Sequence, residues 1–129
     1  MTSEKPPLLI VEDTLDAQEI FGRVLWKVGY TVVGATDGVE ALRVLQAGLR
    51  PWLILLDLMM PGMDGWQFRA AQLKDAALVR IPVVLIGARA DIEVQATHLG
   101  ALGCMPYPLA ARELPRDIDR WWNVVHFPG

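Results

Sequence analysis

Three acidic residues follow two strongly apolar segments of this chain. Glu12 and Asp13 come directly after the run 8–11, and Asp57 closes the run 52–57. An ionised carboxylate at the end of a buried strand loses hydration, so this placement is costly unless a site needs negative charge there. Carboxylates that meet at one edge of a sheet also repel one another, and oxygen ligands of this kind suit Mg²⁺. The pattern therefore predicts a divalent metal site that includes Asp57.

A purely structural role is the competing interpretation of these acids, because aspartate often caps loops and helices. That role accounts for Asp13 or Asp64 taken singly. It does not account for three acids at the ends of two buried strands, and the metal site is the better interpretation.

Length and composition indicate one ordered domain. The 129 residues are 53% hydrophobic and 21% charged, and no Gly/Ser-rich linker or charge run divides them. We expect a single domain over 1–129 without an effector domain.

The net charge of −3 argues against direct binding of nucleic acid or of anionic lipid. The chain shows neither a signal-like start nor an apolar run of membrane length, so a cytoplasmic protein is expected. The lone Cys104 cannot form an internal disulfide and is expected to be a small packed residue rather than a reactive thiol.

Apolar, β-branched segments alternate with segments of helical period, which is typical of an α/β fold with a doubly wound parallel sheet. We expect strands at 8–11, 31–35, 52–57, 82–87 and 103–106. We expect helices from Leu15 to Gly29, over 38–47, from Asp64 to Leu73, from Asp91 to Leu99 and over 112–125. Asp37 is placed to cap the second helix. One apolar stripe of the first helix should pack on the sheet, formed by Leu15, Ile20, Phe21, Val24, Leu25 and Val28.

These residues together make the chain similar to the receiver domain of two-component response regulators. The similarity is carried by Glu12-Asp13, by Asp57, by the loop Met60-Pro61-Gly62-Met63-Asp64-Gly65 and by Gly100-Ala101. It implies a flavodoxin-like five-stranded sheet in the order 2-1-3-4-5 with helices on both faces. It also implies that Asp57 accepts a phosphoryl group from a histidine kinase. By the same resemblance, Mg²⁺ is bound by Asp13, Asp57 and the backbone carbonyl of Met59, and by Glu12 through a water.

The rest of the receiver pattern is missing. Where receivers carry a Thr or Ser after the fourth strand, this chain has Gly87. The aromatic switch position is Cys104, and the Lys position is Tyr107, whose phenol donates one hydrogen bond but brings no charge near neutral pH. Pro108 is retained, so the Tyr107-Pro108 bond is a candidate for the cis form that the family has. Pro106 cannot donate to a ladder and therefore predicts that the fifth strand lies at a sheet edge. Phosphoryl chemistry could persist in such a domain while the usual switch is lost.

Three further residues have two interpretations each. Arg89, two residues after Gly87, is either a cation that replaces the missing Lys or a solvated loop residue. If Arg89 pairs with Asp57 in the metal-free protein, it could hold the domain in one form. Adjacent Trp121 and Trp122 are either anchors of an interface on the face of helix 4, strand 5 and helix 5, or are partly buried against Ile118 or Val125.

The leading hypothesis is an atypical receiver that accepts phosphate on Asp57 with Mg²⁺ from a sensor histidine kinase or a phosphotransfer protein. Its output would pass to a downstream protein partner or a homodimer. The alternative is a phosphorylation-independent pseudo-receiver that works as a protein-protein interaction module. A small phosphatase-like enzyme with Asp57 as nucleophile is more remote, because the second acid such enzymes need is replaced by Met59. A flavodoxin-like electron carrier is disfavoured because the turn after the first strand is acidic and lacks a phosphate-binding nest.

Overall fold

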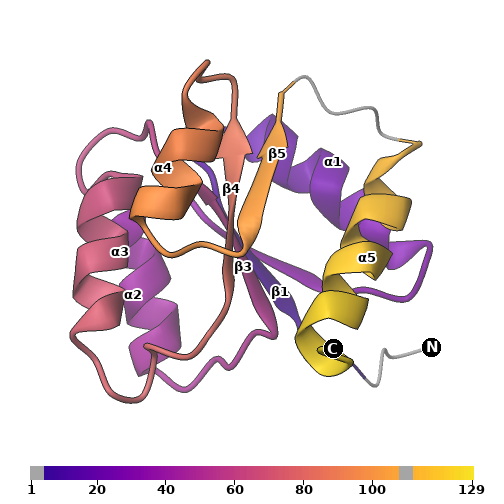
Figure 1. The fold of residues 1–129 in the computed structure, drawn as a ribbon, viewed down its shortest axis with the longest axis horizontal. Coiled ribbons are helices and arrows are strands. Elements are labelled where there is room, and N and C mark those ends of the chain that lie inside the picture. The colour runs from indigo at the N-terminus through magenta and orange to yellow at the C-terminus, as the bar shows by residue number, and fades with distance from the viewer. Residues whose placement is uncertain (1–4, 108–111) are drawn as a thin grey trace.

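The computed structural model describes residues 5–107 and 112–129 of the chain. Five parallel strands form one sheet in the order β2-β1-β3-β4-β5, and helices alternate with the strands along the chain (Figure 1). The strands are β1 (Leu8–Val11), β2 (Val32–Ala35), β3 (Leu53–Asp57), β4 (Val83–Gly87) and β5 (Gly103–Pro106). The helices are α1 (Leu15–Trp26), α2 (Gly38–Gln46), α3 (Gly65–Leu73), α4 (Ile92–His98) and α5 (Leu114–His126). The predicted doubly wound topology and strand order are confirmed.

The sheet is covered by helices on both faces, as its continuous apolar strands require. Helices α1 and α5 lie on one face, and α2, α3 and α4 lie on the other (Figure 1). Alternate residues of each strand therefore enter different cores: Leu8 and Ile10 pack with α1 and α5, whereas Leu9 and Val11 pack with α2, α3 and α4. None of the helices in the described part of the chain is long and apolar enough to cross a bilayer.

Short local motifs start the helices that follow β2 and β3. Asp37 accepts a hydrogen bond from the backbone N–H of Glu40 at 2.8 Å, so it caps α2 as predicted. Asp64 and Gln67 form a reciprocal capping box at the start of α3. These caps fix where each helix leaves the edge of the sheet.

The predicted buried stripe of α1 was wrong in part. Phe21 and Leu25 are buried against the sheet, but Leu15, Ile20 and Val28 are 67%, 53% and 44% exposed. Phe21 and Leu25 are four residues apart and share one side of the helix, whereas Ile20 lies about 100° away from Phe21. Leu15 is the first residue of α1, and Val28 follows its last turn. The apolar period therefore predicted the helix correctly but gave too wide a buried stripe.

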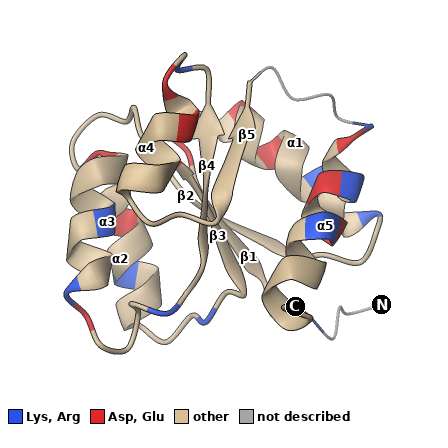
Figure 2. Ribbon diagram, viewed as in Figure 1, with Lys and Arg blue, Asp and Glu red and all other residues tan. Residues whose placement is uncertain are grey.

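Charged residues lie on the helices and loops, while the sheet is almost free of them (Figure 2). Asp57 is the only charged residue within the strands.

The chain leaves β1 toward the α1 face and leaves β3 toward the opposite face, so a switch point lies between these two neighbouring strands. β5 lies at a sheet edge, as Pro106 predicted. Such a crevice beyond the carboxyl ends of the strands is where an open parallel sheet places its ligands.

Candidate functional site

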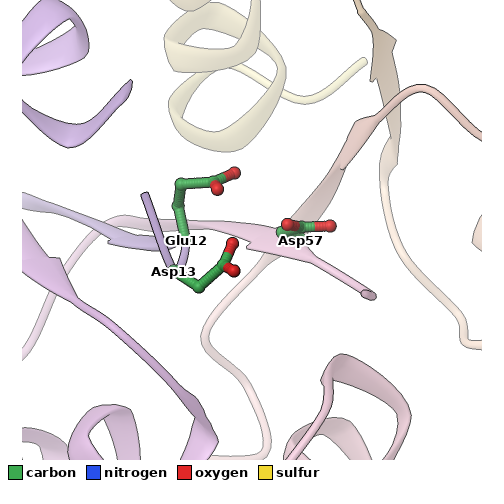
Figure 3. A group of neighbouring side chains, drawn as sticks. All are labelled: Glu12, Asp13 and Asp57. Carbon is green, nitrogen blue, oxygen red and sulfur yellow. The ribbon is translucent and has the colours of Figure 1, made fainter. Parts of the chain in front are cut away.

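Three carboxylates meet at the switch point. One oxygen from each of Glu12, Asp13 and Asp57 lies within 4.8 Å of the others. Glu12 and Asp13 come from the segment that follows β1, and Asp57 stands beside them at the end of β3 (Figure 3). Glu12 is buried, Asp57 is half-buried and Asp13 is exposed. The structure therefore brings the three acids that the sequence predicted into one cluster, with Asp13 on its solvent-exposed side.

Backbone and side-chain donors hold the two less exposed acids. Glu12 accepts a hydrogen bond from the Thr14 backbone N–H at Oε1 and one from the Tyr107 hydroxyl at Oε2, both at 3.2 Å. Its own carbonyl accepts from the Gln18 side chain at 2.7 Å. Asp57 accepts at Oδ1 from the backbone N–H of Met59 at 3.0 Å. The carboxylates are thus oriented before any ligand arrives.

A glycine lets α3 approach the end of β3 closely. A Cβ on Gly65 would lie 2.6 Å from the Asp57 carbonyl oxygen and 2.6 Å from the Leu58 Cα. The Gly65 N–H donates to the Leu58 carbonyl at 3.1 Å. The loop that carries Met59 is therefore held between the strand end and the first turn of the helix.

Burial and mutual repulsion raise the proton affinity of this cluster. The pKa of Glu12 is raised to about 7, first by burial and then by its carboxyl neighbours Asp13 and Asp57. Burial also raises the pKa of Asp57, although the Met59 N–H opposes that effect. A divalent cation would remove this repulsion, and the donor set consists of the hard oxygens that Mg²⁺ prefers. On these grounds the residues present fit the metal that receivers use.

A cavity of about 370 Å³ opens next to Asp57. It is lined by Glu12, Asp57, Leu58, Met59, Ile86, Gly87, Ala88, Arg89, Ile92 and Tyr107. Gly87 has a φ of +145°, and a Cβ there would lie 3.7 Å from Asp57 Oδ1. The wall of the cavity at Gly87 therefore presents backbone rather than a side chain.

Tyr107 and Cys104 are the other two residues that the sequence predicted to be switch positions. The pKa of Tyr107 is raised by burial and by Glu12, so its phenol stays neutral and donates to that carboxylate. Cys104 is partly buried against the core that α2, α3 and α4 cover, and burial raises the pKa of its thiol. A raised pKa disfavours the reactive thiolate. Pro108, and with it the predicted cis bond, lies outside the described residues.

Arg89 lies at the cavity, but its partner is not Asp57. Its Nε and Nη2 donate to the two carboxylate oxygens of Asp91 at 2.8 and 2.9 Å. The guanidinium also lies over the Trp66 ring, 5.2 Å from its centroid, and Nη1 lies 3.6 Å from the Met59 sulfur. The structure thus places Arg89 at the cavity that Asp57 lines, but bonded to Asp91 rather than to Asp57.

The two tryptophans of α5 are half-buried and pack differently. Trp121 covers Gly103 at the start of β5, where an added Cβ would lie 2.5 Å from the ring. Trp122 joins an aromatic cluster with Tyr30, Trp52 and His126, with ring centroids 6.2, 4.9 and 3.7 Å away. Both rings pack within the α5 side of the fold, and their role in an interface stays a prediction.

Sequence reasoning missed one set of residues near the site. Asp91 also accepts a hydrogen bond from the Gln95 amide, and the Gln95 side-chain oxygen accepts from Trp66 Nε1, both at 3.0 Å. The four-residue spacing of Asp91 and Gln95 along α4 was a visible signal. Their link to Trp66 on α3 depends on how the two helices pack and has no local signature.

Comparison with known proteins agrees with this geometry. The family model described as the response regulator receiver domain matches residues 8–119. The chain belongs to this family. It is therefore a receiver domain of the response regulators of two-component systems, which interact with histidine kinases and typically bind Mg²⁺ at an acidic pocket.

Curated relatives and solved structures support the assignment. The chain is 36% identical over 109 residues to an uncharacterized transcriptional regulatory protein, YbdJ, of Bacillus subtilis, and 37% identical over 110 residues to a CpxR homolog of Haemophilus influenzae. Both matches cover 83% of this chain and 46% of the relative, so the chain spans about half the length of these relatives.

Among solved structures, the chemotaxis response regulator CheY4 of Vibrio cholerae has a TM-score of 0.80 at 25% identity, covering 90% of this receiver and 98% of CheY4. A response regulator from Chloroflexus aurantiacus has a TM-score of 0.81 at 27% identity, with 95% and 98% covered. The family is one of signalling domains rather than enzymes of the usual kind.

Proposed function

We propose that this receiver accepts a phosphoryl group on Asp57 from the phosphohistidine of a sensor histidine kinase or a phosphotransfer protein, with Mg²⁺ bound at the acidic cluster. The observation that carries the proposal is the convergence of Glu12, Asp13 and Asp57 within 4.8 Å beside an open cavity. A response regulator similar to this chain, the cyanobacterial phytochrome regulator RcpA, has been solved in phosphorylated form, and it matches with a TM-score of 0.79 at 25% identity over 97% of this chain and 96% of that one.

The transfer requires little from the protein beyond positioning. An Asp57 carboxylate oxygen forms a bond to phosphorus while the bond from phosphorus to the donor's imidazole nitrogen breaks. The electron pair of that bond returns to the imidazole, which then takes up a proton. The Met59 N–H holds Oδ1 of Asp57 and thereby fixes the orientation of the nucleophile.

Glu12, Asp13 and Asp57 would bind the metal, the first of them through a water, and the Met59 carbonyl is the proposed backbone ligand. A bound Mg²⁺ supplies positive charge that neutralises the phosphoryl oxygens. The hydrogen bonds from Thr14 and Tyr107 keep Glu12 in place beside that position.

The domain is atypical in how it would report phosphorylation. Gly87 has no hydroxyl to offer the phosphoryl group, Cys104 cannot act as an aromatic switch, and Tyr107 carries no charge. The same substitutions favour a second candidate, a pseudo-receiver whose binding to a downstream partner or to a second copy through the face of α4, β5 and α5 does not depend on phosphate.

The two candidates separate in one experiment. The protein is incubated with acetyl phosphate and Mg²⁺ and its intact mass is measured. We expect a gain of one phosphoryl group that EDTA prevents and that Asp57→Ala abolishes. Asp75→Asn is the matched control, since Asp75 bonds to the Ala77 N–H beyond the end of α3, and it should be phosphorylated like the parent. No mass gain in the parent protein would leave the pseudo-receiver as the better assignment.

A further inference from the structure

A chain of contacts leads from the Asp57 cavity to α3 and α4. We define the Arg89 network as Arg89, Asp91, Gln95 and Trp66. Arg89 bonds to both carboxylate oxygens of Asp91, Asp91 accepts from Gln95, and Gln95 accepts from the indole N–H of Trp66. The guanidinium of Arg89 also lies over the Trp66 ring, so the network closes on itself.

Arg89 is the only cationic side chain among the described residues that line the cavity. Its bonds to Asp91 raise its pKa further, so it is fully charged at any working pH. Nη1 touches the Met59 sulfur, and the Met59 N–H touches Asp57 Oδ1. Because Gly87 has no side chain, only backbone borders the cavity at that position. A group attached to Asp57 therefore meets no competing side-chain donor from position 87.

A phosphoryl group would compete with Asp91 for this guanidinium. The Arg89 and Asp91 side chains are 36% and 41% exposed, so solvent screens the attraction between them. A phosphoryl group carries more charge than a carboxylate and offers three acceptor oxygens, which the planar guanidinium can bind in a bidentate way. The ion pair is open to solvent on this side, so a group of higher charge can compete with Asp91 for the guanidinium.

We propose that the phosphoryl group on Asp57 draws Arg89 away from Asp91 and thereby opens the Arg89 network. The inference rests on the proposed phosphorylation of Asp57. When Arg89 leaves, Asp91 loses its cation, Gln95 loses the fixed acceptor that orients it, and Trp66 loses the guanidinium over its ring. The signal thus reaches the first turns of α3 and α4 without the hydroxyl and the aromatic residue that the family uses.

Trp66 provides a direct readout of this opening. The protein is labelled with 5-fluorotryptophan, and Trp66→Phe identifies the Trp66 signal among the five fluorine resonances. Spectra are recorded before and after treatment with acetyl phosphate and Mg²⁺, and intact mass gives the phosphoryl occupancy of each sample. We expect the Trp66 resonance to shift in proportion to that occupancy.

Two variants test the order of contacts. In Arg89→Gln, the Trp66 resonance should already be displaced before treatment and should not move further at equal occupancy. In Asp91→Asn, where the competing carboxylate is neutral, it should also be displaced before treatment. Arg80→Gln is the matched control, because Arg80 is exposed and lines a different cavity, between Trp52 and α5, and it should behave like the parent protein.

The outcomes distinguish this inference from the proposed function. A full phosphoryl mass gain with an unmoved Trp66 resonance, or with the same shift in Arg89→Gln as in the parent, would overturn the role of the network and leave Asp57 as the acceptor. An absence of any mass gain would overturn both the phosphoacceptor role and the opening of the network that depends on it.

Discussion

Gly87 shows how one residue changes both the chemistry and the backbone of this receiver. Its φ of +145° lies in a region that residues with a side chain rarely adopt. The space beside it is adequate, since a Cβ would meet Asp57 Oδ1 at an ordinary 3.7 Å. A side chain at position 87 is therefore disfavoured by backbone conformation rather than by crowding.

Introducing a hydroxyl-bearing side chain at position 87 should cost stability. We expect Gly87→Thr to lower the free energy of unfolding by about 1–3 kcal/mol, the usual cost of a residue held in a sparsely populated backbone region. Gly87→Ala should lose a similar amount, because the strain comes with any Cβ. Urea denaturation of the three proteins measures this directly. An unchanged midpoint for both variants would show that β4 can end in an ordinary conformation.

Tyr107 contacts the acidic cluster through Glu12. Its hydroxyl stabilises the charged form of that carboxylate, and a hydrogen bond to a charged group is worth about 1.5–3 kcal/mol. We expect Tyr107→Phe to weaken Mg²⁺ binding by about tenfold near neutral pH, the lower end of that range, measured by titration of the tryptophan fluorescence. Tyr30→Phe removes a hydroxyl that bonds to Asp119 on the α1 and α5 side, and its Mg²⁺ affinity should match the parent. Equal affinities in all three proteins would remove Tyr107 from the site.

At the scale of elements, the sequence predicted the strands and helices well and their packing less well. Buried parallel strands are apolar throughout, so their positions and the edge place of β5 could be inferred. In α3, by contrast, Arg69 and Gln72 are buried, with Arg69 donating to the carbonyls of Leu99 and Gly100. Polar residues on a helix suggest a solvated face, and nothing local reveals that another helix end lies against them.

The close approach of α3 to the end of β3 can be tested by substitution of Gly65. Gly65→Ala should lower the free energy of unfolding by about 1–3 kcal/mol, because the new Cβ would meet backbone atoms that cannot give way. It should also slow phosphorylation of Asp57 by displacing the Met59 loop. Gly22→Ala in α1 is the matched control: its Cβ meets nothing within 4 Å, and the variant should gain about 0.5–1 kcal/mol of helix stability. Urea denaturation and intact mass together follow both effects. Equal loss in the two variants would contradict the proposed role of this contact.

For the whole molecule, the topology brings the acids together, and the acids could therefore be predicted. Glu12 and Asp57 are 45 positions apart, yet Glu12 directly follows β1 and Asp57 ends the neighbouring β3, so strand order alone implies their meeting. The contacts of Tyr107 with Glu12 and of Arg89 with Asp91 depend on loop conformation. No sequence period encodes such loop contacts, so the sequence leaves open whether Arg89 replaces the missing Lys or is a solvated loop residue.

The acidic cluster should give the metal-free protein an unusual dependence on pH. The folded-state pKa of Glu12 is raised to about 7 from 4.5, and that of Asp57 is raised too, so folding favours their protonated forms. Their contribution to stability is complete below the unfolded pKa and is lost as pH rises through the folded value. In EDTA we expect the Tm to fall between pH 5 and pH 8, by on the order of 5 °C for each kcal/mol lost.

Mg²⁺ should reverse that trend, because it binds the deprotonated carboxylates and stabilises the folded protein by mass action. The increase in Tm on adding Mg²⁺ should therefore be small at pH 5 and larger at pH 8. Glu12→Gln removes the acid whose pKa is raised to about 7, so its metal-free Tm should vary less with pH, whereas Asp75→Asn should follow the parent protein. Thermal unfolding followed by circular dichroism at both pH values provides the measurement. A metal-free Tm that rises from pH 5 to pH 8, with a Mg²⁺ effect independent of pH, would show that the three carboxylates are already relieved of their repulsion without a cation.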